Sequence, residues 1–149
     1  MPVGNDKFFL HEGTPMFRLI YISSASEEIS PTDIRDILTT AVSNNRNMEI
    51  TGLLMYNGLN FMQVLEGKRD DIEPLFEKIS NDKRHVSVAS ILQGDADTRI
   101  FAPWAMLFKK VKPETAEDDV PEVTMSEIMA LDMPDNVRTI IKNFDNLLG

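Results

Sequence analysis

The chain has 149 residues, of which 42% are hydrophobic and 26% charged, a composition typical of one globular domain. Its 15 Lys and Arg against 24 Asp and Glu give a net charge of −9, which disfavours nucleic acid and anionic membranes as partners. The chain has no cysteine, which excludes disulfides, thiol nucleophiles and cysteine-bound zinc, and only two histidines, so no metal site is expected. Because no apolar run is long enough to span a membrane and no signal peptide is recognisable, the sequence predicts a cytoplasmic protein.

The chain begins with a segment that carries no periodic pattern. Residues 1–16 mix proline, glycine and charged residues, and we expect them to form a flexible leader. The β-forming run 17–23 then predicts a strand. Ser30-Pro31 supplies an N-cap and a first helical residue, which predicts a helix that begins there. The apolar stripe of this helix falls on Ile34, Ile37, Leu38, Ala41 and Val42.

The middle of the chain predicts a β-hairpin followed by a second helix. Asn57-Gly58 separates the β-forming runs 50–56 and 59–65, and this pair is a strong signal for a hairpin with a type I′ turn. A helical stripe over residues 70–80 then predicts the second helix. Its apolar positions are Ile72, Leu75, Phe76 and Ile79.

Two further strands are predicted at 86–92 and 104–108, which completes the order β-α-β-β-α-β-β. This order is typical of an α+β, ferredoxin-like fold with a five-stranded mixed sheet and two helices on one face. The region 17–110 would form this domain, and 111–149 would supply an acidic linker and C-terminal helices. Pro134 opens a helix with an apolar stripe at 137, 140, 141, 144 and 148, and this stripe is expected to cover the other face of the sheet.

Three polar side chains fall at positions where the pattern calls for apolar ones. Period-two alternation puts Gln63 on the same strand face as Leu59, Phe61 and Leu65. Asn45 lies about 20° around the first helix from Ile34 and therefore falls on its apolar stripe. Tyr21 shares a strand face with two apolar residues. The three side chains could converge on one site.

Each of these residues also has a simpler interpretation. Asn45 could cap the end of its helix, and Tyr21 could be a core residue with a solvated hydroxyl. Gln63 could lie on an exposed edge strand, since a buried amide without partners costs about 1–3 kcal/mol. Trp104 and Met106, on one face of the last predicted strand, could be ordinary core residues. The cluster Lys83-Arg84-His85 could be surface charge or could hold a phosphate-bearing ligand.

No recognisable motif for nucleotide binding, esterase or metalloprotease activity is present, and the chain is not expected to be an enzyme. A small hydrolase of acylphosphatase-like topology would need a basic phosphate loop after the first strand. Here that position carries Glu27 and Glu28, which repel an anion. A ferredoxin-like protein-interaction module without a chromophore is the main alternative.

Several motifs in order resemble the BLUF domain, a family of flavin-binding blue-light sensors. The resemblance extends from about Phe17 to Lys110. The matching segments are residues 17–23 (FRLIYIS), Asn45, residues 50–54 (ITGLL), 61–67 (FMQVLEG), 82–85 (DKRH) and 99–106 (RIFAPWAM).

The resemblance implies a non-covalent flavin, FAD with FMN or riboflavin as possibilities, that stands between the two helices. Asn45 would bind the pyrimidine edge of the ring, and Gln63 would lie between the ring and the Tyr21 hydroxyl. The residues expected to bind the cofactor are Tyr21, Ile37, Asn45, Gln63, Lys78, Ile79, Asp82, Arg84 and His85.

By the same resemblance, light would drive electron and proton transfer from Tyr21 and rearrange the hydrogen bonds of Gln63. An amide carries donors and an acceptor, so its partners can be exchanged without net chemistry. Trp104 or Met106 would pass the change to the last strand, the C-terminal helices and an unknown protein partner. A homodimer or larger homo-oligomer is expected.

Overall fold

The computed structural model describes residues 16–110 and 123–147. The predicted leader, the acidic linker and position 148 lie outside these ranges, except that Met16 opens the first strand. The elements are β1 Met16–Ala25, α1 Pro31–Met48, β2 Thr51–Tyr56, β3 Asn60–Lys68, α2 Arg69–Ser80, β4 His85–Ala96, β5 Leu107–Lys110, α3 Met125–Met129 and α4 Asp135–Asp145.

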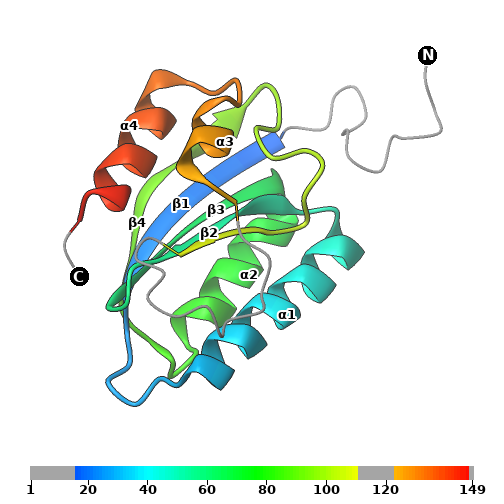
Figure 1. The fold of residues 1–149 in the computed structure, drawn as a ribbon. Helices are drawn as coiled ribbons and strands as arrows, with labels where there is room; N and C mark the ends of the chain where they lie inside the picture. The colour runs from blue at the N-terminus through cyan, green and yellow to red at the C-terminus, as the bar shows by residue number, and fades with distance from the viewer. Residues whose placement is uncertain (1–15, 111–122, 148–149) are drawn as a thin grey trace.

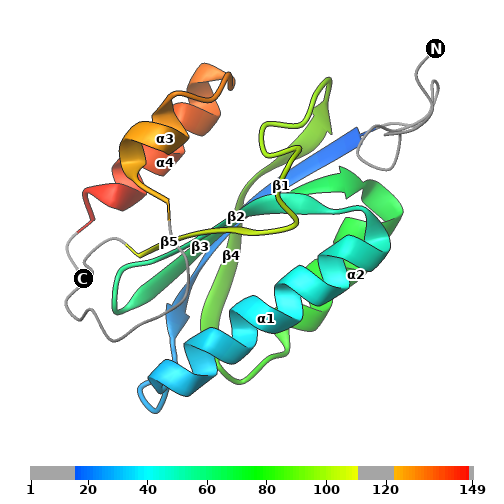
Figure 2. The same cartoon turned by 45° about the vertical axis from the view of Figure 1, so that its right-hand side comes forward.

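The strands form one five-stranded sheet in the order β4-β1-β3-β2-β5. All neighbouring pairs are antiparallel except β2 and β5, which run parallel, so the sheet is mixed as the sequence predicts. Helices α1 and α2 lie on one face, and α3 and α4 lie on the other (Figures 1 and 2). The predicted α+β, ferredoxin-like fold is confirmed.

Helix α1 begins where the sequence predicts but ends later. The Ser30 hydroxyl accepts from the Asp33 backbone N–H (3.1 Å), and the Asp33 carboxylate accepts from the Ser30 N–H (3.0 Å), which completes a capping box. The helix continues to Met48 and is capped by Glu49 in the left-handed conformation (φ 57°). Asn45 therefore lies inside the last turns of α1 and not at its end.

The Asn57-Gly58 hairpin is confirmed, but its turn is not type I′. Gly58 has a positive φ (99°), whereas Asn57 does not, and type I′ needs both. Instead, the Asn57 side-chain oxygen accepts from the backbone N–H groups of Leu59 (2.9 Å) and Asn60 (2.7 Å). Leu59 thus belongs to the turn, where it is 58% exposed, and not to the apolar face expected for it.

Two hydrophobic cores lie on opposite faces of the sheet. The first fills the space between the sheet and helices α1 and α2, and includes Phe17, Leu54 and Phe61. The second packs residues of the sheet against the apolar stripe of α4, which is buried at Val137, Ile141 and Phe144. Burial of each such side chain stabilises the fold by about 1.5–3 kcal/mol. In the described part, no helix is long and apolar enough to cross a membrane.

The prediction that Trp104 and Met106 share the last strand is wrong, because β5 begins only at Leu107. Pro103, which has no N–H to donate, precedes them, and the Trp104 N–H closes a turn onto the Phe101 carbonyl (2.9 Å). The two side chains separate to opposite faces of the sheet. Met106 belongs to the first core, whereas Trp104 packs against the second.

Candidate functional site

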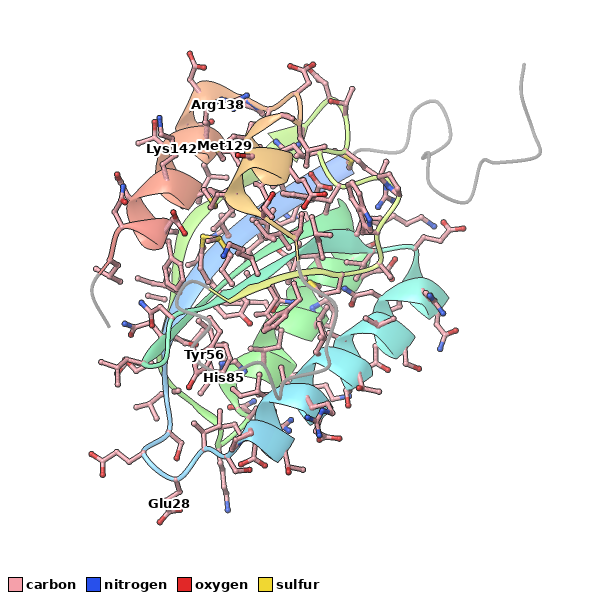
Figure 3. All side chains as sticks on the ribbon, viewed as in Figure 1. Glu28, Tyr56, His85, Met129, Arg138 and Lys142 are labelled. Carbon is pink, nitrogen blue, oxygen red and sulfur yellow. The ribbon has the colours of Figure 1, made fainter. Side chains whose placement is uncertain are left out.

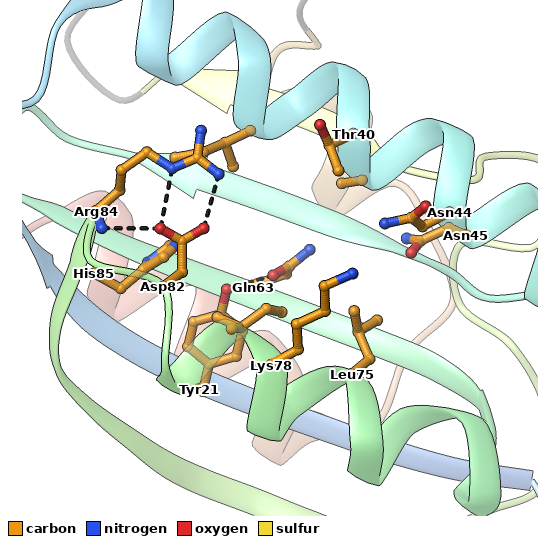
Figure 4. A pocket seen from close by; sticks show the side chains of 13 residues that line it. Tyr21, Thr40, Asn44, Asn45, Gln63, Leu75, Lys78, Asp82, Arg84 and His85 are labelled. Carbon is orange, nitrogen blue, oxygen red and sulfur yellow. Dashed lines mark hydrogen bonds and ion pairs between the residues drawn. The ribbon is translucent and has the colours of Figure 1, made fainter.

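A cavity of about 130 Å³ lies between α1, α2 and the sheet (Figure 4). Every residue that the sequence identified as a candidate cofactor contact lines this cavity. The lining residues are Tyr21, Ile37, Thr40, Ala41, Asn44, Asn45, Gln63, Leu75, Lys78, Ile79, Asp82, Arg84 and His85.

Four lining residues were not predicted as site residues, although the helical pattern contained a signal for them: Thr40, Ala41, Asn44 and Leu75. On α1 the lining positions follow Ile37 at helical spacing, and Thr40 is one of them. The same spacing relates Leu75 to Lys78 and Ile79 on α2. Residues three and four apart on a helix share a face, so one expected contact on each helix could have pointed to the others on that helix.

Tyr21 and Gln63 form the polar floor of the cavity. They are directly paired across β1 and β3 and are only 1% and 4% exposed. The Tyr21 hydroxyl donates a hydrogen bond to Gln63 Oε1, and Gln63 Nε2 donates to the Met106 sulfur (3.6 Å). Gln63 is therefore not on an exposed edge, and both ends of its buried amide have a partner.

Burial controls the protonation of Tyr21. Desolvation raises the pKa of its hydroxyl far above the usual range, and the nearby negative charge of Asp82 raises it further. Tyr21 is thus a neutral phenol near neutral pH, with its proton directed at Gln63 Oε1. The hydrogen bond to the Gln63 amide gives this proton a direct route to Oε1.

Asn45 connects α1 to the segment that precedes β5. It is buried, and its Nδ2 donates to the Ala105 carbonyl (2.8 Å). The interpretation of this side chain as a helix cap is wrong, since Glu49 ends the helix and Asn45 bonds outside it. Within residues 16–110 and 123–147 no hydrogen bond to its amide oxygen is seen, so this oxygen is placed to accept from a ligand.

The apolar walls of the cavity come from the two helices. Ile37 on α1 and Ile79 on α2 are both half-buried and line it from opposite sides. Lys78 on α2 is exposed and lies at the wall as well (Figure 4). A flat apolar group could therefore insert between the isoleucines with its polar edge toward Gln63 and Asn45.

Arg84 is held by two carboxylates at one end of the cavity. Its Nη2 lies 2.7 Å from Asp82 Oδ2, and its Nη1 lies 2.9 Å from Asp36 Oδ2. Hydrogen bonds from Arg84 hold the pKa of Asp82 below its usual value, and those bonds raise the pKa of Arg84. Because its charge is balanced, the guanidinium suits a neutral hydrogen-bonding group better than a phosphate.

His85 is a buried, neutral residue beside Tyr21. Its Nδ1 lies 2.9 Å from Ser23 Oγ, and its ring packs at 4.7 Å from the Phe61 ring. Desolvation lowers the pKa of His85, and this effect together with the charge of Arg84 outweighs the opposing charge of Asp82. The cluster of residues 83–85 is therefore not simply surface charge. Figure 3 shows His85 on the side of the sheet that α1 and α2 cover, away from Arg138 and Met129 of the C-terminal helices.

The described residues contain no group of three or more His, Cys, Asp or Glu side chains that could hold a metal ion. The chemistry of the site is thus that of a buried phenol, two amides and two apolar walls.

Comparison with known proteins identifies the family of this arrangement. The family described as "Sensors of blue-light using FAD", BLUF, matches residues 16–107. Photoactivated adenylate cyclase subunit beta of Euglena gracilis is 35% identical over 98 residues, which cover 64% of this chain and 11% of the relative. The antirepressor BluF of Escherichia coli is 30% identical over 88 residues, or 59% of this chain and 22% of that protein.

Solved structures agree with the fold. BlrB, a BLUF protein in its dark state, superposes with a TM-score of 0.67 at 27% identity, covering 89% of this chain and 97% of BlrB. BlrP1 of Klebsiella pneumoniae superposes with a TM-score of 0.75 at 28% identity, covering 88% of this chain but 33% of that one. The chain spans about a tenth of the length of the photoactivated cyclase subunit that it matches. It belongs to the BLUF family.

Proposed function

We propose that this chain is a blue-light photoreceptor that binds a flavin non-covalently between α1 and α2. The observation that carries the proposal is the buried hydrogen bond from Tyr21 to Gln63 on the floor of the cavity. Membership of a family of blue-light sensors supports it.

The residues of the cavity fit a flavin in chemistry. Ile37 and Ile79 would contact the two faces of a planar ring, and Asn45 and Gln63 would meet its hydrogen-bonding edge. Arg84, whose charge is balanced by carboxylates, would contact a neutral carbonyl of the ring, with Asp82 and His85 beside it. An amide needs such partners, because a buried polar group without one costs about 1–3 kcal/mol.

FAD is the proposed cofactor, with FMN and riboflavin as alternatives. A second hollow of about 400 Å³ adjoins the cavity and shares Asn44, Leu75 and Lys78 with it, which leaves room for the tail of a dinucleotide. Lys78 would attract the phosphate groups there, whereas the carboxylates of Asp70 and Asp71 in the same hollow would repel them. The relative BlrP1 has been solved with FMN.

In the proposed mechanism, a bound flavin supplies an acceptor that light makes strongly oxidising. Tyr21 would give one electron to that acceptor and pass its phenolic proton to Gln63 Oε1 along the existing hydrogen bond. Once the electron and the proton had both returned to Tyr21, the Gln63 amide would be left rotated, with the positions of its NH₂ group and its oxygen exchanged and no net transfer of electrons or protons. The contact between Gln63 Nε2 and the Met106 sulfur would then change, and this change would be the first structural step of the signal.

The signal would pass from Met106 to the second core and to α3 and α4, and from there to a protein partner. Trp104 packs against that second core and is placed to respond to the same movement. The cyclase activity of the Euglena relative is not carried over, because the match covers only 11% of that protein. The sensor itself is proposed to catalyse no reaction, and the cytoplasmic location and the homo-oligomer stay predictions.

The test is to purify the full chain, equilibrate it with FAD, FMN or riboflavin, and record absorption before and after blue light. We expect a stoichiometric bound flavin and a red shift of its absorption that reverses in the dark. A colourless protein that takes up none of the three would refute the proposal and favour an interaction module without a chromophore.

A further inference from the structure

Glu66, near the end of β3, is a fully buried carboxylate that makes four hydrogen bonds. Its Oε1 accepts from the Thr51 hydroxyl (3.0 Å) and the Phe101 N–H (3.0 Å). Its Oε2 accepts from the Ile100 N–H (2.7 Å) and Arg18 Nε (3.3 Å). A carboxylate offers about four acceptor positions, so all of them are in use.

The four donors belong to two different parts of the fold. Arg18 and Thr51 are on the strands that flank β3, whereas Ile100 and Phe101 belong to the connection between β4 and β5. The same connection is held again by Arg18, whose Nη2 donates to the Thr98 carbonyl (2.7 Å). Glu66 therefore fastens the β4–β5 connection to the centre of the sheet.

Arg99 strengthens this attachment from within the connection. Its Nη1 donates to the Thr51 hydroxyl (2.9 Å) and to the Glu66 backbone carbonyl (3.1 Å). The polar groups around the carboxylate are therefore linked to one another as well as to Glu66. Such a network fixes one arrangement of its members more strongly than separate bonds would.

The connection that Glu66 holds links the two cores of the protein. Ile100 and Phe101 are buried in the core that packs against α3 and α4. Met106, at the other end of the connection, is buried in the core beneath α1 and α2, where its sulfur contacts Gln63 Nε2 at 3.6 Å. A movement at Met106 can thus reach α3 and α4 through a short segment whose far end is fixed at Glu66.

We propose that Glu66 is a positioning residue for the light response. Its carboxylate holds residues 98–101, and through them it sets how Met106 meets Gln63 and how the change reaches α3 and α4. The inference rests on the proposed photoreceptor function. Glu66 does not line the cavity, so its carboxylate acts on the site indirectly, through the connection that it holds to the sheet.

The test uses Glu66→Gln in the full, flavin-loaded chain. The substitution keeps the shape but replaces one acceptor oxygen with an NH₂ group, which then faces donors. We expect unchanged flavin binding and a preserved red shift. The rate constant of dark recovery should change by about two- to thirtyfold, and light-induced changes in hydrogen exchange over 125–145 should be lost.

Glu73→Gln is the matched control, because this exposed carboxylate on α2 forms an ion pair with Arg69 on its own helix and lies away from the β4–β5 connection. It should recover at the wild-type rate. Thr51→Val is the second variant and decides the question if Glu66→Gln does not fold. It removes one donor to Glu66 and one acceptor for Arg99 Nη1 without placing a new donor against the carboxylate, and should alter recovery in the same direction by a smaller factor.

The outcomes separate this inference from the proposed function. A wild-type chain without a red shift refutes the photoreceptor function itself. A wild-type red shift, with variants at Glu66 and Thr51 that recover and signal to α3 and α4 like wild type, overturns the positioning role alone. A lower denaturation midpoint with unchanged recovery also overturns it, since that result is expected of a purely structural residue.

Discussion

The hydrogen bond between Tyr21 and Gln63 should appear as a coupling energy in a double-mutant cycle. Tyr21→Phe removes the donor and leaves Gln63 Oε1 buried without a partner. Gln63→Leu removes the acceptor and leaves the Tyr21 hydroxyl buried in the same way. Each single substitution should lower the free energy of unfolding by about 1–3 kcal/mol. The double variant has neither orphaned group and should lose less than the sum by about 1–3 kcal/mol.

The assay is equilibrium unfolding in urea of all four proteins in the dark, at one pH and one flavin concentration. Tyr56→Phe is a matched control, because that hydroxyl bonds the Gly58 carbonyl at the surface and the ring keeps its stacking on Phe61. It should change stability by less than about 0.5 kcal/mol. Additivity of the two core substitutions within about 0.5 kcal/mol would contradict the buried hydrogen bond.

Three further predictions concern other parts of the molecule. Burial lowers the pKa of His85 from 6.5, so the unfolded chain binds more protons near that pH, and stability should fall as the pH drops from about 7.5 to 5.5. His85→Asn should flatten this pH dependence of urea midpoints, and an unchanged slope would contradict the assignment. Ile141→Ala should lower the free energy of unfolding by about 2–5 kcal/mol, because this α4 side chain is fully buried against the sheet. A loss under about 1 kcal/mol would argue against the packing of α4 on the sheet. Ser30→Ala should lower the free energy of unfolding by about 0.5–2 kcal/mol through loss of the α1 capping box. An unchanged midpoint of thermal unfolding would contradict this role.

Two polar residues of the cavity, Gln63 and Asn45, could be predicted from the residues alone because each of them breaks a short-range pattern, whereas Lys78, Asp82, Arg84 and His85 were expected as cofactor contacts from the resemblance. Gln63 interrupts the period of two along β3, and Asn45 interrupts the helical period along α1. Both periods fix which face a side chain occupies, whatever lies across from it. The element order followed from the same periods and from the Ser30 cap.

Contacts between distant segments could not be predicted in this way. The placement of Trp104 and Met106 on one strand failed because a turn at Pro103, and not β-propensity, decides the backbone there. Glu66 reads as an ordinary charged residue at a strand end. Its backbone donors at Ile100 and Phe101 lie 34 and 35 residues away, and no local pattern records them.

The same limit applies to the amide of Asn45. Its helical position was correct, but its partner, the Ala105 carbonyl, lies 60 residues away on an irregular segment. A helix-terminal asparagine is commonly a cap, and only the tertiary structure shows that this one bonds across to another segment. Local patterns thus identified Asn45 and Gln63 as candidate site residues, and long-range packing decided which groups they contact.

The most direct test of the central claim compares the flavin absorption of wild type and Gln63→Leu, both loaded with flavin, before and after blue light. We expect a reversible red shift in wild type, and no shift in Gln63→Leu even though the variant still binds flavin. A Gln63→Leu protein that undergoes the wild-type shift and recovery would contradict the claim that this amide carries the light response.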